Sequence, residues 1–202
     1  MKKAYILASY RTAGCRANKG KFKDMRPDDL AAAALSGLVE RTGIDAARID
    51  DVLLGCAFPE GEQGMNVARI AALKAGLPYQ VPAQTINRFC SSGLQSIAMA
   101  ANQIASGQSE VMIAGGVDSI SMRTRQEAGK SKQNKRLMEE KPEIFMAMGN
   151  TAEVVARRYN VTREMQDEYA LQSQIRYAAA VDAGKIAEEI VGIALFYPRY
   201  ST

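Results

Sequence analysis

Residues 84–96 are Gln-Thr-Ile-Asn-Arg-Phe-Cys-Ser-Ser-Gly-Leu-Gln-Ser, and this segment joins a predicted strand to a predicted helix. Val81 to Ile86 is short, apolar and rich in β-branched residues, which predicts a buried strand. After Cys90, apolar residues recur at helical spacing and predict a helix of about four turns: Leu94, Ile97, Ala98, Ala101, Ile104 and Ala105. The small residues between the predicted strand and the predicted helix suit a tight turn and a helix N-cap. The sequence therefore places a thiol where a strand passes into a helix.

Cys90 has two interpretations at that position. The first backbone N–H groups of a helix have no partner inside it, and the helix dipole favours negative charge there. These groups favour a thiolate and can hold a developing oxyanion, so Cys90 is a candidate nucleophile. A free cysteine is more often a small buried apolar residue without chemistry. The segment by itself leaves both interpretations open.

Composition indicates an ordinary globular protein. Of the 202 residues, 47% are hydrophobic and 24% are charged, values that favour neither disorder nor a membrane class. No run of 18 apolar residues occurs, so we expect no membrane partner. The apolar run near Met1 ends at Ser9, too early for a signal peptide, and we expect a cytoplasmic protein.

The cysteine and histidine content limits the possible chemistry. Cys15, Cys56 and Cys90 are an odd number without close pairing or zinc-site spacing, so we expect neither a disulfide framework nor a metal site. The sequence contains no histidine, the commonest general base. Any Cys-His chemistry must therefore borrow its histidine from another polypeptide.

The positive charge is concentrated in one stretch. The net charge is +4, and the surplus lies between Arg123 and Lys141. No aromatic residue interrupts this stretch, so base stacking is unsupported and we expect no nucleic-acid partner. The stretch is either a solvated loop or a site for phosphates or another anionic partner.

Strands and helices are predicted to alternate along the first part of the chain. The strands are predicted at residues 3–9, 51–58, 81–86, 110–117 and 189–193, and the first helices follow Pro27 and Asn66 and end near Gly43 and Gly76. This order predicts a layered α/β fold, a mixed five-stranded sheet with helices on its faces. The strand at 110–117 is wholly apolar and is predicted to be central.

The pattern changes after residue 118. From Ser119 to about Met148 the sequence is polar and lacks regular apolar spacing, and helices are predicted at 151–159 and from Thr162 to about Ala183. We therefore expect an α/β core in residues 1–118, a mostly helical insertion in residues 119–184, and a last core strand with an atypical tail in residues 185–202.

Several segments, in the right order, resemble one family. Residues 87–96 are similar to the active-site segment of the thiolases, which include 3-ketoacyl-CoA thiolases and acetyl-CoA acetyltransferases. The other similar segments are Arg-Pro-Asp-Asp-Leu at 26–30, Gly-Glu-Gln-Gly-Met-Asn-Val-Ala-Arg at 61–69, Ala-Gly-Gly-Val-Asp-Ser at 114–119 and Met-Gly-Asn-Thr-Ala-Glu at 148–153. The likeness runs from about Ala4 to Val191.

The resemblance implies a fold, a reaction and site residues. The fold is the thiolase N-terminal domain, with 119–183 as the family's loop domain over the CoA site. Cys90 is the implied nucleophile, acylated during thiolytic cleavage of a 3-ketoacyl-CoA or the reverse Claisen condensation in fatty acid metabolism. Met148 aligns with a residue that lines the pantetheine channel, although ordinary packing is the alternative. Coenzyme A or acyl-CoA is then a substrate, no cofactor is permanently bound, and the protein is a homodimer or homotetramer.

The sequence also departs from the family. Thiolases are longer, and their second half supplies two catalytic histidines and a second catalytic cysteine. No histidine is present here, and Cys15 and Cys56 do not match the second cysteine. From Gly192 onward the sequence no longer resembles the family, as expected of a truncated or frameshifted gene or of a two-chain enzyme. We expect this chain to lack the C-terminal catalytic half and to be inactive or weakly active alone.

Two alternatives to the thiolase interpretation stay open. The chain is a catalytically incomplete fragment that acts as a self-associating module, or it is a related condensing enzyme for carrier-protein thioesters. Residues 61–69 and 148–153 favour a thiolase over the condensing enzyme.

Overall fold

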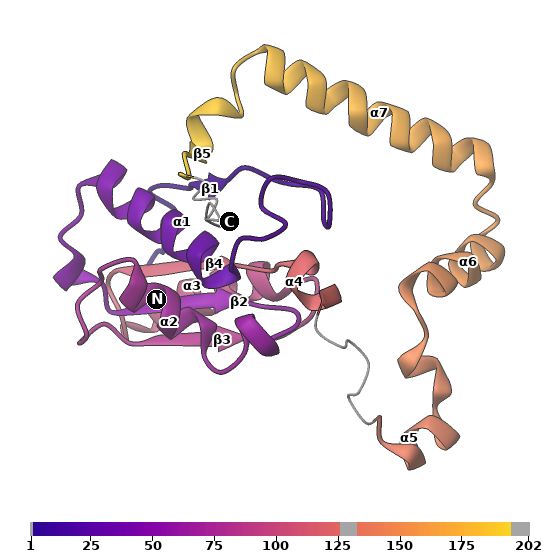
Figure 1. Cartoon of the computed structure of the whole chain (residues 1–202), viewed down its shortest axis with the longest axis horizontal. Helices are drawn as coiled ribbons and strands as arrows, with labels where there is room; N and C mark the ends of the chain where they lie inside the picture. The colour runs from indigo at the N-terminus through magenta and orange to yellow at the C-terminus, as the bar shows by residue number, and fades with distance from the viewer. Residues whose placement is uncertain (1, 126–132, 195–202) are drawn as a thin grey trace, which may run out of the picture. The chain divides into compact units, whose positions relative to one another are not determined.

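The computed structural model describes residues 2–125 and 133–194. Contacts divide the chain into two compact units, Met1–Ala128 with Glu189–Thr202, and Gly129–Glu188. We call them the core unit and the helical unit, and each is described by itself; Figure 1 labels their elements. The predicted boundaries near residues 118 and 184 stay predictions.

A three-stranded parallel sheet forms the centre of the core unit. It consists of β2 (Asp51–Gly55), β3 (Ala83–Ile86) and β4 (Met112–Gly116), in the order β3-β2-β4. The prediction that residues 110–117 form the central strand is wrong, because β4 pairs only with β2 among the described residues. The central strand is β2, whose Val52 and Leu53 are fully buried. Apolar composition reports burial but not which strands are neighbours.

Helices cover both faces of this sheet, as the α/β pattern predicted. On one face, α1 (Pro27–Thr42) and α2 (Val67–Lys74) pack together over Val52 and Leu54. Because side chains alternate along a strand, Leu53 and Gly55 point to the other face. There, α3 (Ser92–Ser106) packs against β2 and β4. The layered α/β fold is confirmed.

Local signals set the ends of these helices. Pro27 is the first residue of α1, and the left-handed Gly43 (φ 63°) ends it as predicted. The carboxylate of Asp28 accepts two hydrogen bonds from the Arg26 guanidinium (2.9 and 3.2 Å), which raise the pKa of Arg26. Asn66 caps α2 by accepting the backbone N–H of Arg69.

The predicted first strand, Lys3 to Ser9, is wrong. The structure places β1 later, at Arg11–Thr12, where it pairs in parallel with β5 (Ile190–Val191). A strand needs a neighbouring strand for its backbone hydrogen bonds, and the apolar content of a segment does not show that such a neighbour exists. Instead, Tyr5, Ile6 and Leu7 are 71%, 80% and 89% exposed. In the described residues, the mixed five-stranded sheet is therefore replaced by a parallel three-stranded sheet and a separate parallel pair.

Short elements complete the chain. The core unit also contains α4 (Ile120–Arg125) and the 3₁₀ turns Ala46–Arg48, Gly61–Gln63 and Ala187–Glu189, of which the last begins in the helical unit. No helix in the two described stretches is long and apolar enough to span a bilayer.

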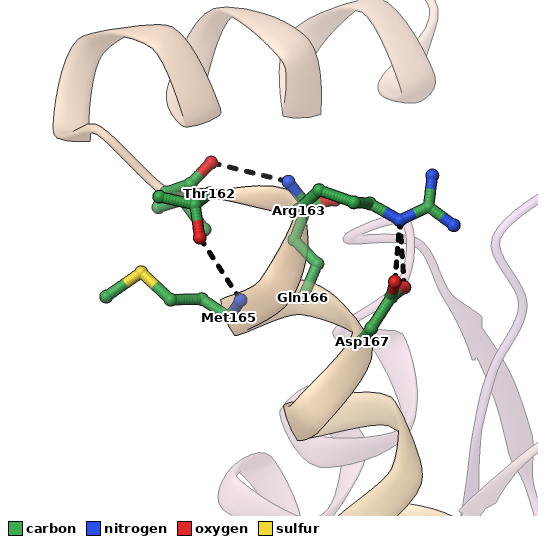
Figure 2. A network of polar contacts seen from close by, with 6 residues as sticks. Thr162, Arg163, Met165, Gln166 and Asp167 are labelled. Carbon is green, nitrogen blue, oxygen red and sulfur yellow. Dashed lines mark hydrogen bonds and ion pairs between the residues drawn. The ribbon is translucent and has the colours of Figure 1, made fainter.

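The helical unit contains α5 (Lys135–Glu140), a 3₁₀ turn (Pro142–Phe145), α6 (Met148–Tyr159) and α7 (Arg163–Asp182). The predicted cap of α7 is confirmed: Thr162 Oγ1 accepts the Met165 N–H at 3.3 Å. Figure 2 shows this bond beside the ion pair of Arg163 and Asp167, which joins side chains one turn apart. The predicted basic stretch falls partly on residues 126–132 and the predicted atypical tail partly on 195–202; both segments lie outside the described residues.

Candidate active site

Cys90 lies in the turn that joins β3 to α3. It comes two residues before the first residue of α3 and is exposed. The exposure removes the alternative of a small buried apolar cysteine. The structure thus places the thiol, as predicted, at the helix N-terminus, where partial positive charge favours an anion.

The backbone before Cys90 has a rare conformation. Phe89 has a φ of 47°, in the left-handed region. That conformation is uncommon for a bulky residue and costs roughly 1–2 kcal/mol. Two backbone hydrogen bonds close the turn, from Ser91 N–H to the Arg88 carbonyl (3.2 Å) and from Ser92 N–H to the Phe89 carbonyl (3.0 Å). The chain therefore reverses sharply at Phe89 and leaves Cys90 at the apex.

Ser92 fixes this turn from the buried side. Its side chain is 2% exposed; its Oγ accepts the Arg88 N–H at 2.8 Å and donates to the Phe89 carbonyl at 2.5 Å. Ser91 occupies the N-cap position but makes no side-chain cap bond. Its hydroxyl donates to the Arg88 carbonyl at 2.9 Å instead. The two serines therefore stabilise the turn rather than occupy the N–H groups of the first helical turn.

Glycines bring this helix start close to the sheet. A Cβ on Gly55 at the end of β2 would lie 2.3 Å from the carbonyl carbon of Ser92. A Cβ on Gly116 at the end of β4 would lie 3.1 Å from the carbonyl oxygen of Gly55 in the neighbouring strand. Only a residue without a side chain at the end of β2 allows the backbone of α3 to approach this closely.

A polar cluster lies at the same edge of the sheet, with the exposed Asp118 bonded to buried neighbours. Asp118 follows β4, and its carboxylate accepts the backbone N–H of Ala57 at 3.2 and 3.0 Å and the amide of Gln63 at 3.3 Å. Gln63 is 2% exposed and also accepts the backbone N–H of Ser119 at 2.9 Å. This cluster joins the loops that follow β2 and β4, and sequence reasoning assigned it no role. The sequence feature that could have indicated this cluster is the position of polar residues just after parallel strands.

The other two cysteines differ from Cys90. Cys56 is fully buried, and its Sγ lies 3.6 Å from Oδ1 of Asp118. Burial, with the negative charge of Asp118, raises the pKa of the Cys56 thiol to about 12. Cys15 is exposed but lies in the segment between β1 and α1, twelve positions before the first residue of α1. Cys90 alone of the three combines exposure with a helix start.

Met148 is the first residue of α6 and is 70% exposed. It belongs to the helical unit, whereas Cys90 belongs to the core unit, so the structure does not bring these two candidates together within one unit. Among the described residues, no group of three or more acidic, cysteine or histidine side chains is placed to hold a metal ion.

Comparison with known proteins identifies the family. The family model described as the N-terminal domain of thiolase matches residues 4–197, which is nearly the whole chain. The chain belongs to the thiolase family. The match continues beyond Val191, where the resemblance was predicted to end, and includes Gly192 to residue 197.

Thiolases from several organisms are similar to this chain. It is 46% identical over 193 residues to a 3-ketoacyl-CoA thiolase of Bacillus subtilis, with 96% of this chain and 49% of that protein covered. It is 41% identical over 212 aligned positions to a β-ketoadipyl-CoA thiolase of Acinetobacter baylyi, covering 96% and 52%. An acetyl-CoA acetyltransferase of Rhizobium meliloti is 40% identical over 196 residues, covering 92% and 50%. The chain spans about half the length of these curated relatives.

Proposed function

We propose that this chain supplies the nucleophilic half of a thiolase active site, with Cys90 as the residue that carries the acyl group. The observation that carries the proposal is the exposed thiol of Cys90 at the start of α3, inside the region that matches the thiolase N-terminal domain. Relatives named 3-ketoacyl-CoA thiolase and acetyl-CoA acetyltransferase support acyl-CoA as the substrate and acyl transfer as the reaction.

The proposed reaction has two acyl transfers. The Cys90 thiolate attacks the 3-keto carbon of a 3-ketoacyl-CoA, the bond between C2 and C3 breaks, and the released carbanion takes a proton to form acetyl-CoA. The shortened acyl group stays on Sγ. The thiolate of free CoA then attacks the thioester, and Cys90 leaves as a thiolate. One difficult carbon–carbon cleavage is thereby divided into two easier steps.

Groups outside these 202 residues must assist. The sequence holds no histidine, so a histidine that takes the proton of Cys90 or of CoA has to come from elsewhere. A general base contributes roughly 10²- to 10⁴-fold in rate, and an oxyanion donor roughly 10²- to 10³-fold. We therefore propose that the 202-residue chain forms an acyl-cysteine slowly and has little or no thiolase turnover.

Acetyl transfer to the chain tests this proposal. The purified chain is incubated with acetyl-CoA and analysed by mass spectrometry of its cysteine peptides. We expect acetylation of Cys90 ahead of Cys15 and Cys56, with Cys90→Ala losing the label and Cys15→Ala keeping it. Equal acetylation of Cys90 and Cys15 would overturn the proposal. Thiolysis of acetoacetyl-CoA at rates typical of complete thiolases, abolished in Cys90→Ala, would show that the site is complete.

Self-association is a second proposed property, as a homodimer or homotetramer. Apolar side chains are exposed at the start of α3, where Phe89, Leu94 and Ile97 are 66%, 72% and 41% exposed. Apolar surface of this kind favours burial against another protein surface. Size-exclusion chromatography with light scattering tests the proposal, and a monomer over the whole concentration range would contradict it.

A further inference from the structure

Asn87 links the turn that holds Cys90 to the neighbouring strand end. Its Nδ2 donates to the carbonyl of Ala57 at 3.2 Å, and its Oδ1 accepts the backbone N–H of Phe89 at 2.8 Å. Ala57 lies just after β2, whereas Asn87 and Phe89 lie just after β3. One side chain therefore holds the loops of two adjacent strands together.

The Ala57 end of this link is itself fixed. The N–H of Ala57 donates to both carboxylate oxygens of Asp118, and Asp118 also accepts the buried Gln63 amide. The backbone of Ala57 is therefore held on its N–H side by the loop after β4 and on its carbonyl side by Asn87. This gives Asn87 a rigid base from which to hold the turn.

The Phe89 end of the link is the strained position. Asn87 accepts the N–H of the residue with φ 47°, and the next residue is Cys90. Non-glycine residues keep such a conformation only when their surroundings impose it, and strain of this kind gathers at functional sites. Ser92 holds the carbonyl side of Phe89, and Asn87 holds its N–H side. The ring of Phe89 also lies 6.3 Å from that of Phe58 in the loop after β2.

We propose that Asn87 is a positioning residue for Cys90. By holding Phe89 in the left-handed conformation against the fixed Ala57 carbonyl, it keeps the Cys90 thiol at the start of α3. Asn87 makes these contacts with backbone groups and acts on the reaction only through Cys90. The inference rests on the proposed role of Cys90 as nucleophile.

Competitive thiol labelling of the full chain tests the inference. Iodoacetamide labels Cys90 and the exposed Cys15 in one sample, and the ratio of the two rates reports on the Cys90 site. We expect Asn87→Ala to slow labelling of Cys90 roughly 3- to 10-fold, the range that one net hydrogen bond supplies, and to leave Cys15 unchanged. An unchanged Cys90 rate in the folded variant would overturn the proposal.

A rescue experiment separates positioning from a general loss of stability. Glycine adopts a positive φ without a Cβ penalty, so Phe89→Gly makes the left-handed turn independent of Asn87. We expect Phe89→Gly, added to Asn87→Ala, to return the Cys90 rate to within about 2-fold of the Phe89→Gly single variant. Absence of this rescue would overturn the assigned mechanism.

Two further variants keep the test decisive. Asp45→Ala removes the same kind of bond, since Asp45 Oδ1 accepts the N–H of Ala47 two residues on, at 3.0 Å. We expect it to leave Cys90 labelling unchanged. Asn87→Ser serves if Asn87→Ala does not fold, because a serine hydroxyl can accept the Phe89 N–H but is too short to keep the bond to Ala57. Its expected Cys90 rate is roughly 2-fold below wild type, and a rate equal to wild type would count against the link to Ala57.

The proposed function and this inference fail in different ways. If wild-type Cys90 is neither acetylated nor labelled faster than Cys15, the nucleophile assignment fails. If wild-type Cys90 is labelled preferentially but Asn87→Ala leaves that preference intact, only the role of Asn87 fails.

Discussion

The core unit and the helical unit both contain long helices, but only the long helices of the core unit have buried residues. The 16-residue α1 has six buried residues, among them Ala31 and Leu35 against the sheet. The 20-residue α7 has none. Caps and side-chain pairs along the helix specify α7, whereas packing against α2 and the apolar cluster that it shares with the sheet stabilises α1. Because most helix stability in proteins comes from packing, the same kind of substitution should have very different effects in the two units.

The largest difference is expected from shortening an apolar side chain. Leu53 is fully buried in β2, and Ile175 is 51% exposed in α7. Leu53→Ala should lower the free energy of unfolding by about 3 kcal/mol, because it loses burial and leaves a cavity. Ile175→Ala should change it by less than about 0.5 kcal/mol. Urea unfolding followed by circular dichroism measures both, and equal losses would show that Ile175 is also packed.

The next largest difference between the two units is expected from replacing a glycine with alanine. Gly55→Ala would place its Cβ 2.3 Å from the backbone of Ser92, so α3 must shift. We expect a loss of about 2 kcal/mol and slower labelling of Cys90. At Gly149 in α6 a Cβ meets nothing within 4 Å. Gly149→Ala should therefore stabilise its helix by up to about 1 kcal/mol, seen as increased helical circular dichroism. Wild-type stability and labelling in Gly55→Ala would contradict the close approach of α3.

The buried Cys56 should make the core unit sensitive to alkaline pH. Its pKa is raised to about 12 in the folded state, so the unfolded chain releases this proton at lower pH than the folded chain does. The stabilising contribution is present below about pH 9 and is lost as pH rises toward 12, by up to about 1.4 kcal/mol per pH unit. Between pH 8 and pH 10, wild type should lose about 1.4 kcal/mol more stability than Cys56→Ala. Parallel losses in the two proteins would contradict burial of the thiol.

The smallest of these effects is expected at the cap of α7. Thr162→Ala removes the hydroxyl that accepts the Met165 N–H and should destabilise α7 by about 1 kcal/mol. Thr162→Ser keeps the hydroxyl and is the matched control. Faster amide hydrogen exchange in the first turn of α7, with unchanged exchange in β2, is the expected result. Exchange that rises equally in both units would indicate that the units unfold together.

Local features of the candidate site could be predicted from the sequence. The turn from strand to helix at Cys90 follows from a β-branched run, small residues and helical apolar spacing, all within about twenty neighbouring residues. Asn87 was visible in the same segment, but its role depends on Ala57, thirty positions earlier. Asp118 and Gln63 lie 55 positions apart, and no local pattern connects them.

The alternation of strands and helices, the helix ends at Gly43 and Thr162, and a thiol placed before a helix all follow from local sequence patterns. These features depend on backbone preferences and hydrogen bonds between near neighbours. Long-range contacts in the folded chain determine that β2 is the central strand, that Lys3 to Ser9 forms no strand, and that Cys90 is exposed while Cys56 is buried. Those outcomes depend on which distant segments come into contact. Strand pairing and side-chain burial each need a second segment, and a local sequence pattern describes only the first.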